Sequence, residues 1–284
     1  MNYRHAFHAG NFADVVKHAV LVRILVHLRA KPAAFRVIDT HAGAGRYDLN
    51  GPEAARSLEW REGIERLVTA ASIGEQARVL LAPYLDAIAA FNGPGGLASY
   101  PGSPALVRAF LRVQDRLLAC EVEPNAAVAL ARYLAGDRRS KALAIDGWTA
   151  LHAYVPPKER RGLVLIDPSF EDAGDFARLG QAVEAAQRKW ASGTYLLWYP
   201  IKERVGPDAL SRRLRRSGIG KVLRAELSLG GTRADNRLGA CGLVVVNPPW
   251  TLAGELAILL PELAAILSGG GGGAHRVDWV ASEK

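Results

Sequence analysis

Two short segments place an acid or amide, one or two prolines and an aromatic ring directly after an apolar run. They are residues 167–170 (Asp-Pro-Ser-Phe) and residues 247–250 (Asn-Pro-Pro-Trp). An acid or amide oxygen together with a backbone carbonyl can accept both N–H bonds of an exocyclic amine. The nitrogen lone pair, otherwise delocalised into the base, can then attack an electrophile in line. Either segment could therefore hold an adenine amino group, with the aromatic ring stacked on an extruded base.

A glycine turn follows the first predicted strand, in the segment VIDTHAGAGRYDL. Gly43 and Gly45 permit a tight turn and a close approach of the backbone to a ligand at the carboxyl end of the strand. A dinucleotide fingerprint needs a third glycine where Asp48 stands, which disfavours a nicotinamide enzyme. The spacing of Asp39, Gly43 and Gly45 instead resembles the loop that binds S-adenosylmethionine. A glycine pair alone is equally compatible with a structural turn.

Acids also end the next two predicted strands. Glu121 closes the second strand, where it can accept hydrogen bonds from both ribose hydroxyls of a nucleoside cofactor. Asp146 closes the third strand, where it can accept the adenine amino group while Gly147 leaves space for the ring. Each acid alone is more readily explained as a solvated strand end. Three acids on successive strands beside a glycine turn favour cofactor binding.

Strand-length apolar runs alternate with helix-length segments, which is typical of a parallel sheet with helices on both faces. We predict strands at 35–39, 117–122, 142–146, 163–167, 194–199, 221–229 and 241–246. Helices are predicted at 104–114, 124–136, 172–191 and 207–217. The last two strands are joined by too few residues for a helical crossover, so they must pair antiparallel. This is the α/β layout of a Rossmann-like class I methyltransferase with a seven-stranded, mostly parallel sheet.

Two amphipathic helical patterns, 52–71 and 74–91, follow each other with no strand between them. They interrupt the alternation between the first and second strands. We therefore expect residues 49–98 to form a small helical insertion subdomain. Residues 1–48 and 99–284 would then form the methyltransferase core.

The predicted topology decides between the two proline segments. Asp167 ends the fourth strand beside the first, at the switch point where a substrate can reach the cofactor. An antiparallel last strand carries Asn247 to the opposite rim, where its prolines end the strand and Trp250 is expected to pack. We therefore expect Asp167 and the Pro168 carbonyl to accept the amine, and Phe170 to stack on the base.

Composition limits the class of protein and its partners. The 284 residues are 49% hydrophobic and 23% charged, as in ordinary soluble proteins. The net charge of +8 favours a polyanionic partner, nucleic acid first and an anionic membrane second. Cys120 and Cys241 lie in apolar runs, which fits a reducing compartment and offers neither a disulfide framework nor a metal cluster. No secretory signal or membrane span is evident, so we expect a cytoplasmic protein without a bound metal.

The chain resembles RlmJ, the bacterial 23S rRNA adenine-N6 methyltransferase family, from residue 3 to the last predicted strand. The most specific segments are YRHAFHAGNFADVVKH, DTHAGAGRY, YPGSP, RRGLVLIDP, GTYLLWYP and VNPPW. The resemblance implies a monomeric enzyme with a Rossmann-like fold and a small helical insertion. Its methyl donor would be S-adenosyl-L-methionine, and its substrate 23S rRNA, either free or in an assembly intermediate.

The resemblance also implies roles for individual residues. Asp167 takes the place of the catalytic acid. Cofactor contacts are implied at His18, His41, Ser103, Glu121, Asp146 and Gly147, and positions near the reaction centre at Tyr3, His5 and Lys17. From the residues alone, Tyr3 and His5 could be a frayed terminus and Lys17 a solvated helix face. His41 could be a turn residue, and Ser103 could cap the helix that follows it.

This chain departs from the family motif Asp-Pro-Pro-Tyr at its last two positions, Ser169 and Phe170. Phe170 keeps the ring, whereas Ser169 restores an N–H group and frees a φ angle that proline would fix, which could relax the loop. The acid and the Pro168 carbonyl remain, so we expect activity. A DNA adenine-N6 methyltransferase and a catalytically weakened RNA-binding protein stay open as alternatives, although no second domain large enough to read a duplex is evident.

Contacts with RNA are expected on basic segments near the reactive rim, by which we mean the edge of the sheet where Asp167 is expected to lie. The candidates are KERR at 158–161, Lys202 and Arg204, and RRLRR at 212–216. For any single residue among them, a solvated surface is an equally good explanation.

Overall fold

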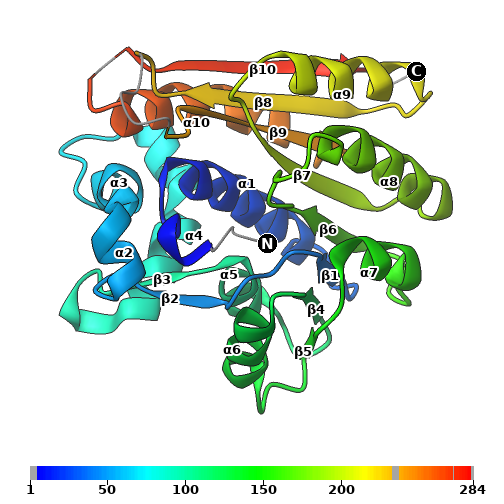
Figure 1. Ribbon diagram of the computed structural model, residues 1–284, viewed down its shortest axis with the longest axis horizontal. Helices are drawn as coiled ribbons and strands as arrows, with labels where there is room; N and C mark the ends of the chain where they lie inside the picture. The colour runs from blue at the N-terminus through cyan, green and yellow to red at the C-terminus, as the bar shows by residue number, and fades with distance from the viewer. Residues whose placement is uncertain (1–4, 232–236, 271, 283–284) are drawn as a thin grey trace.

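The apolar runs of the chain form an eight-stranded sheet at the centre of the molecule (Figure 1). The computed structural model describes residues 5–231, 237–270 and 272–282. The strand order in the sheet is β10-β8-β9-β7-β6-β1-β4-β5. The strands are β1 (Arg36–Asp39), β4 (Arg116–Cys120), β5 (Ser140–Leu143), β6 (Gly162–Ile166), β7 (Thr194–Pro200), β8 (Val222–Ser228), β9 (Ala240–Val246) and β10 (Ala274–Ala281).

The sheet is parallel at one end and antiparallel at the other. Strands β5, β4, β1, β6 and β7 are parallel neighbours, whereas β9 runs antiparallel to both β7 and β8. This confirms the predicted α/β fold and its antiparallel last hairpin. The predicted count of seven strands is wrong, because β10 pairs antiparallel with β8 at the sheet edge. Most of β10 is exposed or half-buried, so its sequence lacks the continuous apolar run of a central strand.

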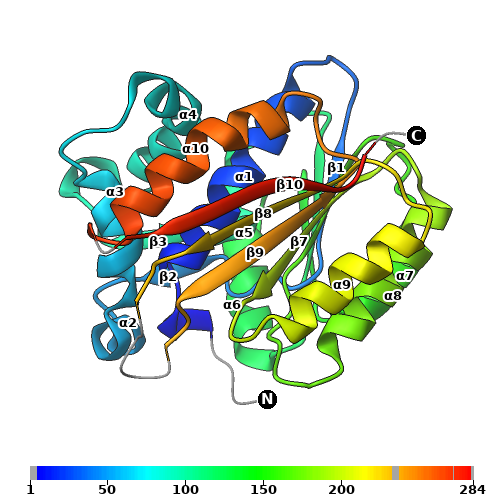
Figure 2. The ribbon, with the colours of Figure 1, turned by 90° about the horizontal axis from the view of Figure 1, so that it is seen from above.

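Helices cover both faces of the sheet (Figure 2). One face packs against α1 (Phe12–Arg29), α5 (Ser103–Phe110), α6 (Pro124–Leu134) and α10 (Leu252–Leu267). The other face packs against α7 (Gly147–Tyr154), α8 (Asp175–Lys189) and α9 (Val205–Arg216). Successive strand residues alternate between the two cores: Leu163 and Leu165 face the first, and Val164 and Ile166 the second. Burial on both faces explains why the central strands read as unbroken apolar runs. No helix in the described ranges is long and apolar enough to cross a membrane.

A helical segment lies between β1 and β4, bracketed by two short strands. Strand β2 (Arg46–Asp48) pairs antiparallel with β3 (Ser99–Pro101), so the two ends of the segment lie side by side. Between them lie α2 (Pro52–Ser57), a π-helical turn η2 (Arg61–Glu65), α3 (Arg66–Val68), α4 (Glu75–Asn92) and the turn η3 (Gly93–Gly95). The division into a core and an insertion subdomain of residues 49–98 stays a prediction. A continuous helix over 52–71 is wrong, because Leu58 ends α2 in the left-handed conformation, at φ 54°.

The π-helical turn packs closely on the start of α1. The Ile64 N–H donates to the Gly10 carbonyl at 2.8 Å, and Asn11 Nδ2 donates to Glu59 Oε2 at 3.0 Å. Gly63 lies between these contacts with non-helical backbone angles, φ −109° and ψ −105°. A Cβ atom at Gly63 would overlap the Gly10 carbonyl oxygen. The helical segment is therefore fastened to the N-terminal residues by a contact that only glycine allows.

We predict that Gly63→Ala destabilises the protein by about 1–3 kcal/mol, because its methyl group must displace backbone of the N-terminal segment. Urea unfolding measures this change. Gly254→Ala is the matched control, since it lies in α10 with open space around its Cβ position. It should gain up to about 1 kcal/mol from helix propensity. Equal shifts in both variants would contradict the close contact at Gly63.

Candidate active site

Three acids reach the same rim of the sheet because β1 lies between β6 and β4. Asp39 ends β1 and is in register with Leu165 of β6 and Ala119 of β4. Asp167 and Glu121 are the first residues after β6 and β4. A pocket of about 430 Å³ opens at this rim, and its walls include Lys17, His18, His41, Gly43, Ser103, Glu121 and Asp167. The predicted placement of Asp167 beside the glycine turn is confirmed.

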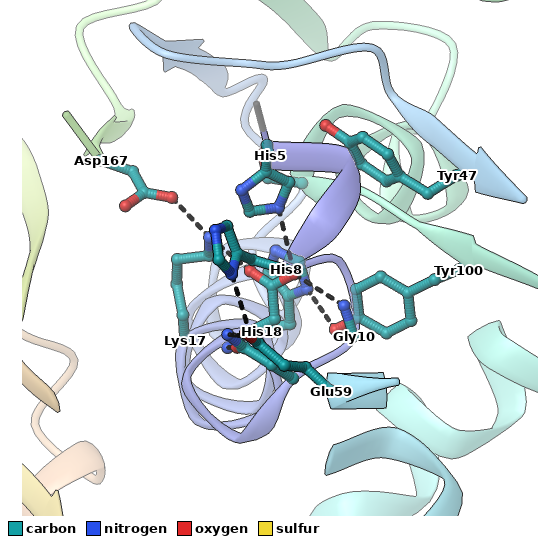
Figure 3. A network of polar contacts seen from close by, with 12 residues as sticks. His5, His8, Gly10, Lys17, His18, Tyr47, Glu59, Tyr100 and Asp167 are labelled. Atoms are coloured by element: carbon teal, nitrogen blue, oxygen red, sulfur yellow. Dashed lines mark hydrogen bonds and ion pairs between the residues drawn. The ribbon is translucent and has the colours of Figure 1, made fainter. Parts of the chain in front are cut away.

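Lys17 on α1 joins the N-terminal helix to the reactive rim. Its Nζ lies 2.5 Å from Asp167 Oδ2 and 2.8 Å from Asp14 Oδ1, and Figure 3 shows its contact with Asp167. The Lys17 side chain is only 4% exposed. Burial alone would lower the pKa of Lys17, but the two carboxylates hold that pKa well above its usual value. Lys17 is therefore a buried ammonium ion rather than a residue on a solvated helix face.

Asp14 organises the N-terminal segment around this lysine. Its Oδ2 accepts from the Gly10 N–H at 2.9 Å and from His5 Nε2 at 3.1 Å. Burial would raise the pKa of Asp14, but the positive charge of Lys17 and the neighbouring His5 hold it well below its usual value. His5 lies in the turn η1 (His5–Phe7), and its ring contacts Tyr47 at 5.1 Å between centroids. His5 is thus tied into the pocket wall, whereas Tyr3 lies outside the described residues.

The glycine turn and Glu121 are joined by hydrogen bonds. The Gly43 N–H donates to Glu121 Oε2 at 2.8 Å, and the N–H groups of Val122 and Glu123 donate to Oε1. Gly43 and Gly45 both have positive φ, 62° and 80°. A Cβ atom at Gly43 would overlap the Tyr47 hydroxyl group. The turn therefore needs glycine, and it keeps the Glu121 carboxylate at the pocket wall.

Asp39 is held by Ser103 beneath the pocket. The Ser103 hydroxyl donates to Asp39 Oδ2 at 2.7 Å. Gly102 is the N-cap residue of α5, so the alternative explanation of Ser103 as a helix cap is wrong. Asp39 is fully buried, and this burial raises its pKa to about 7.

The two pocket histidines make different contacts. His18 is buried, and this burial lowers its pKa to about 3. Its Nδ1 lies 2.6 Å from the Tyr100 hydroxyl, whereas its Nε2 is buried without a hydrogen-bond partner among the described residues. Burial also lowers the pKa of His41, to about 4, and its Nδ1 lies 2.8 Å from Thr40 Oγ1. Both rings are therefore neutral near pH 7.

Asp146 and Gly147 lie behind His41, outside the set of residues that line the pocket. Strand β5 ends at Leu143, so the prediction that Asp146 ends the strand is wrong. Asp146 is instead the N-cap of α7 and accepts from the Thr149 N–H at 2.8 Å. A Cβ atom at Gly147 would overlap the Thr40 carbonyl oxygen and crowd the His41 ring. Gly147 therefore allows α7 to approach the turn after β1.

The three residues after Asp167 lie in different surroundings. Ser169 lines the pocket, Pro168 is buried, and Phe170 lines a groove of about 830 Å³ between α8 and α9. Phe170 has a positive φ of 52° and packs against Phe176 at 4.8 Å between ring centroids. The backbone turn at Phe170 therefore directs its ring away from the residues that line the pocket.

The second proline segment lies at the opposite rim, as predicted. Val246 at the end of β9 pairs with Tyr195 near the start of β7, and Asn247 Nδ2 donates to the Ser192 carbonyl at 3.0 Å. The expectation that Trp250 packs is wrong, since it is 86% exposed. It lies in the short turn between β9 and α10, outside both cores.

The basic segments were expected near the reactive rim, but most of them lie elsewhere. Residues 158–161 precede β6, and residues 212–216 at the end of α9 precede β8, so both segments lie toward the opposite rim. Arg215 Nε accordingly contacts the Val280 carbonyl at the end of β10. Lys202 and Arg204 follow β7 and do share the rim of Asp167. Arg204 is paired with Glu226 and Asp208. Residues that precede a parallel strand and residues that follow it lie at opposite rims.

Asp14, Tyr47 and Tyr100 were not identified from the sequence as parts of this site, whereas the family resemblance implied Lys17. Asp14 and Lys17 lie three residues apart, a spacing that places both on one helix face, and this could have indicated the ion pair. Tyr47 lines the pocket and Tyr100 contacts His18 behind it, and both come from short strands that carry no clear strand pattern. Within the described ranges, no group of three or more His, Cys, Asp and Glu side chains is arranged to hold a metal ion.

Comparisons with known proteins show to which family the chain belongs. The family model described as "RsmJ: Ribosomal RNA large subunit methyltransferase D, RlmJ" matches residues 32–281. The chain belongs to the RlmJ family. RlmJ membership confirms the resemblance read from the sequence motifs and makes the chain a methyltransferase.

Three relatives show how far the RlmJ likeness extends. Two proteins named "Ribosomal RNA large subunit methyltransferase J", from Haemophilus influenzae and Escherichia coli, are 38% and 37% identical over 100% of both chains. A crystal structure of a Legionella pneumophila protein is 32% identical, with a TM-score of 0.86. The match covers 96% of this chain and 98% of that one.

We predict that Asp39 makes stability fall as the pH rises. The folded protein holds a proton on Asp39 between about pH 4 and its folded pKa of about 7, where the unfolded chain has lost it. Relative to Asp39→Asn, wild type should therefore lose about 2–3 kcal/mol of unfolding free energy between pH 5 and pH 8. Urea titrations at each pH measure this difference.

Asp115→Asn provides the control, because the pKa of Asp115 is shifted the other way. Burial opposes the shift, but hydrogen bonds from Arg112 hold the pKa of Asp115 below its usual value. Its contribution is present above about pH 4 and lost only as the pH falls further. The difference between wild type and Asp115→Asn should therefore stay constant from pH 5 to pH 8. A constant difference for Asp39→Asn as well would contradict a protonated Asp39.

Proposed function

We propose that this protein transfers a methyl group from S-adenosyl-L-methionine to the N6 amino group of an adenine in 23S rRNA. The observation that carries the proposal is the position of Asp167, directly before Pro168, at the pocket rim beside the glycine turn. The RlmJ family and the two named relatives support ribosomal RNA as the substrate. The choice of an adenine amino group rests on the acceptor chemistry of the acid and the carbonyl.

The pocket fits a nucleoside carrying a charged amino-acid part. It offers an unpartnered buried nitrogen at His18 and a carboxylate at Glu121, and its wall is glycine backbone where a Cβ atom would not fit. When bound, S-adenosylmethionine supplies a methyl group already activated by its sulfonium. Glu121 is proposed to accept the ribose hydroxyls. The residues proposed for the cofactor are His18, His41, Gly43, Gly45, Ser103, Glu121, Asp146, Gly147 and Asp167.

Asp167 and the Pro168 carbonyl are proposed to accept the two N–H bonds of the target amine. Lys17 holds Asp167 Oδ2 at 2.5 Å, so the acceptor is positioned before any substrate arrives. A fixed acceptor of this kind does not have to reorganise during the reaction. His5 and Tyr3 are proposed to lie beside the target base, with His5 positioned through Asp14.

Phe170 is proposed to provide a stacking face for a flipped adenine. Its ring lines the groove between α8 and α9, whereas Ser169, next to it in the chain, lines the pocket. A base stacked there would leave the rest of the RNA strand near Lys202 and Arg204. Phosphate contacts at these residues would contribute to binding in a salt-dependent way.

Two other functions use the same residues and are separated by one assay. A DNA adenine-N6 methyltransferase would use the same acid and carbonyl on a different polymer. A catalytically weakened RNA-binding protein would retain RNA without methylating it. Transfer of labelled methyl groups to deproteinised rRNA, with duplex DNA in a parallel reaction, distinguishes all three. We expect label in rRNA and none in DNA.

We predict that Asp167→Asn lowers the rate of methyl transfer to rRNA by at least roughly 100-fold, the scale of losing one preorganised electrostatic group. An amide at this position offers one acceptor oxygen and does not compensate the Lys17 charge. The measurement is single-turnover transfer of labelled methyl groups.

Asn247→Ala is the matched variant for the second proline segment. Within the described ranges its side chain donates only to backbone carbonyls at the far rim, so the methylation rate should stay near that of wild type. Circular dichroism and urea unfolding check that both variants fold. An active Asp167→Asn enzyme together with an inactive but folded Asn247→Ala enzyme would contradict the proposal. The chemistry would then belong to residues 247–250 rather than to residues 167–170.

A further inference from the structure

Three buried side chains from different elements form one hydrogen-bonded chain behind the pocket. Tyr84 of α4 lies 2.9 Å from Tyr100 of β3, measured between their hydroxyl oxygens. The Tyr100 hydroxyl lies 2.6 Å from Nδ1 of His18 on α1. Each of the three side chains is at most 1% exposed. Figure 3 shows Tyr100 beside the helix that carries His18.

The direction of these hydrogen bonds follows from counting protons. The Tyr84 hydroxyl has Tyr100 as its sole hydrogen-bond partner within the described ranges. If His18 Nδ1 donated to Tyr100, Tyr100 would donate to Tyr84, and the Tyr84 proton would be buried without an acceptor. If Tyr84 donates to Tyr100 and Tyr100 donates to His18 Nδ1, both hydroxyl protons have an acceptor. Only the Nε2–H of His18 is then left without a partner among the described residues. A buried polar group without a partner is costly, so the second direction is favoured.

This direction determines what His18 offers to the pocket. Its Nδ1 is an acceptor, and the proton of the neutral ring must therefore be on Nε2. That nitrogen is buried without a partner, and His18 lines the pocket wall. The lone pair of a protonated ring nitrogen belongs to the aromatic system, so this N–H can only donate, to an acceptor atom of a ligand. The free donor therefore points to an acceptor group supplied by whatever fills the pocket.

His41 offers the opposite group to the same pocket. The Thr40 hydroxyl lies 2.9 Å from the Leu165 carbonyl, which can only accept, so the hydroxyl proton belongs there. Thr40 Oγ1 must then accept from His41 Nδ1–H at 2.8 Å. His41 therefore presents a lone pair on Nε2, whereas His18 presents a proton on the same atom.

We propose that Tyr100 fixes the tautomer of His18, so that Nε2–H donates to the carboxylate in the amino-acid part of the cofactor. The identity of that ligand rests on the proposed function. A carboxylate is the strongest acceptor on S-adenosylmethionine, and hydrogen bonds to charged acceptors are the stronger ones. Tyr100 acts through His18 and is a positioning residue. Tyr84, from the helical segment between β2 and β3, completes the chain without determining the tautomer.

The tautomer can be measured on the protein alone. Long-range nitrogen–proton correlation spectra of protein with ¹⁵N-labelled histidine distinguish protonated from unprotonated ring nitrogens. We expect His18 to carry its proton on Nε2 and His41 to carry its proton on Nδ1. His18→Gln and His41→Gln identify the two sets of signals. Protonation of His18 on Nδ1 in wild type would overturn the proposal.

Two probe ligands test the carboxylate contact. S-adenosylhomocysteine carries the amino-acid part, and 5′-methylthioadenosine retains the nucleoside and sulfur without it. Tyr100→Phe should weaken S-adenosylhomocysteine binding by roughly ten-fold or more and change methylthioadenosine binding by less than about two-fold. Isothermal titration calorimetry gives both affinities. A variant that is merely misfolded would lose both ligands alike.

Tyr84→Phe is the matched control, because it removes a buried hydroxyl from the same chain and leaves the Tyr100 donation to His18 intact. The ratio of the two affinities and the His18 tautomer should stay as in wild type. Equal losses of both ligands in a Tyr100→Phe protein that is folded by circular dichroism, or the same change of ratio in Tyr84→Phe, would overturn the proposal. If wild type binds neither probe, the proposed function fails together with the carboxylate assignment, whereas the tautomer spectrum still decides the role of Tyr100.

Discussion

A buried ammonium ion between two carboxylates is the constraint on which the rest of this site depends. Lys17 is 4% exposed, and its partners Asp14 and Asp167 are 3% and 14% exposed. Burying a charge is costly unless it is paired, and removing one partner leaves an uncompensated charge. Satisfying Lys17 therefore forces α1 and the first residue after β6 to meet. Asp14 extends the same constraint to the N-terminal turn through His5. The Asp167 carboxylate is held in place by this pairing before any ligand binds.

Sheet topology decides which proline segment faces the pocket. Asn247 ends a strand much as Asp167 does, and its tetrapeptide has both prolines, yet β9 runs antiparallel and carries it to the far rim. This choice could be predicted, because apolar runs mark the strands and a short connection forces the last pair to be antiparallel. The glycine turn and Glu121 were predictable for the same reason, since both follow strands at one rim. Residues 158–161 precede β6, and residues that precede a parallel strand lie at the rim opposite to those that follow it. The expectation that they lie near Asp167 was therefore wrong on topology alone.

The parts that escaped prediction depend on contacts between residues far apart in the chain. Tyr84 and Tyr100 meet His18 across α4, β3 and α1, and no local pattern of residue types indicates such a chain. The break at Gly63 reflects the close approach of Gly10, which the amphipathic pattern of residues 52–71 does not reveal. Strand β10 is an exposed edge strand, so it lacks the apolar signature of its neighbours. The RlmJ resemblance supplied candidate roles for the pocket histidines, and the structure supplies the contacts that distinguish their two tautomers.

The central claim is that the carboxylate at the reactive rim acts on an exocyclic amine of adenine. Identifying the nucleoside that receives the methyl group tests this claim most directly. Purified protein, 23S rRNA and isotopically labelled S-adenosylmethionine are incubated, and the RNA is digested to nucleosides for mass spectrometry. We predict that the label is found in N6-methyladenosine. Label in a ring-carbon, ribose or cytosine product instead would contradict it.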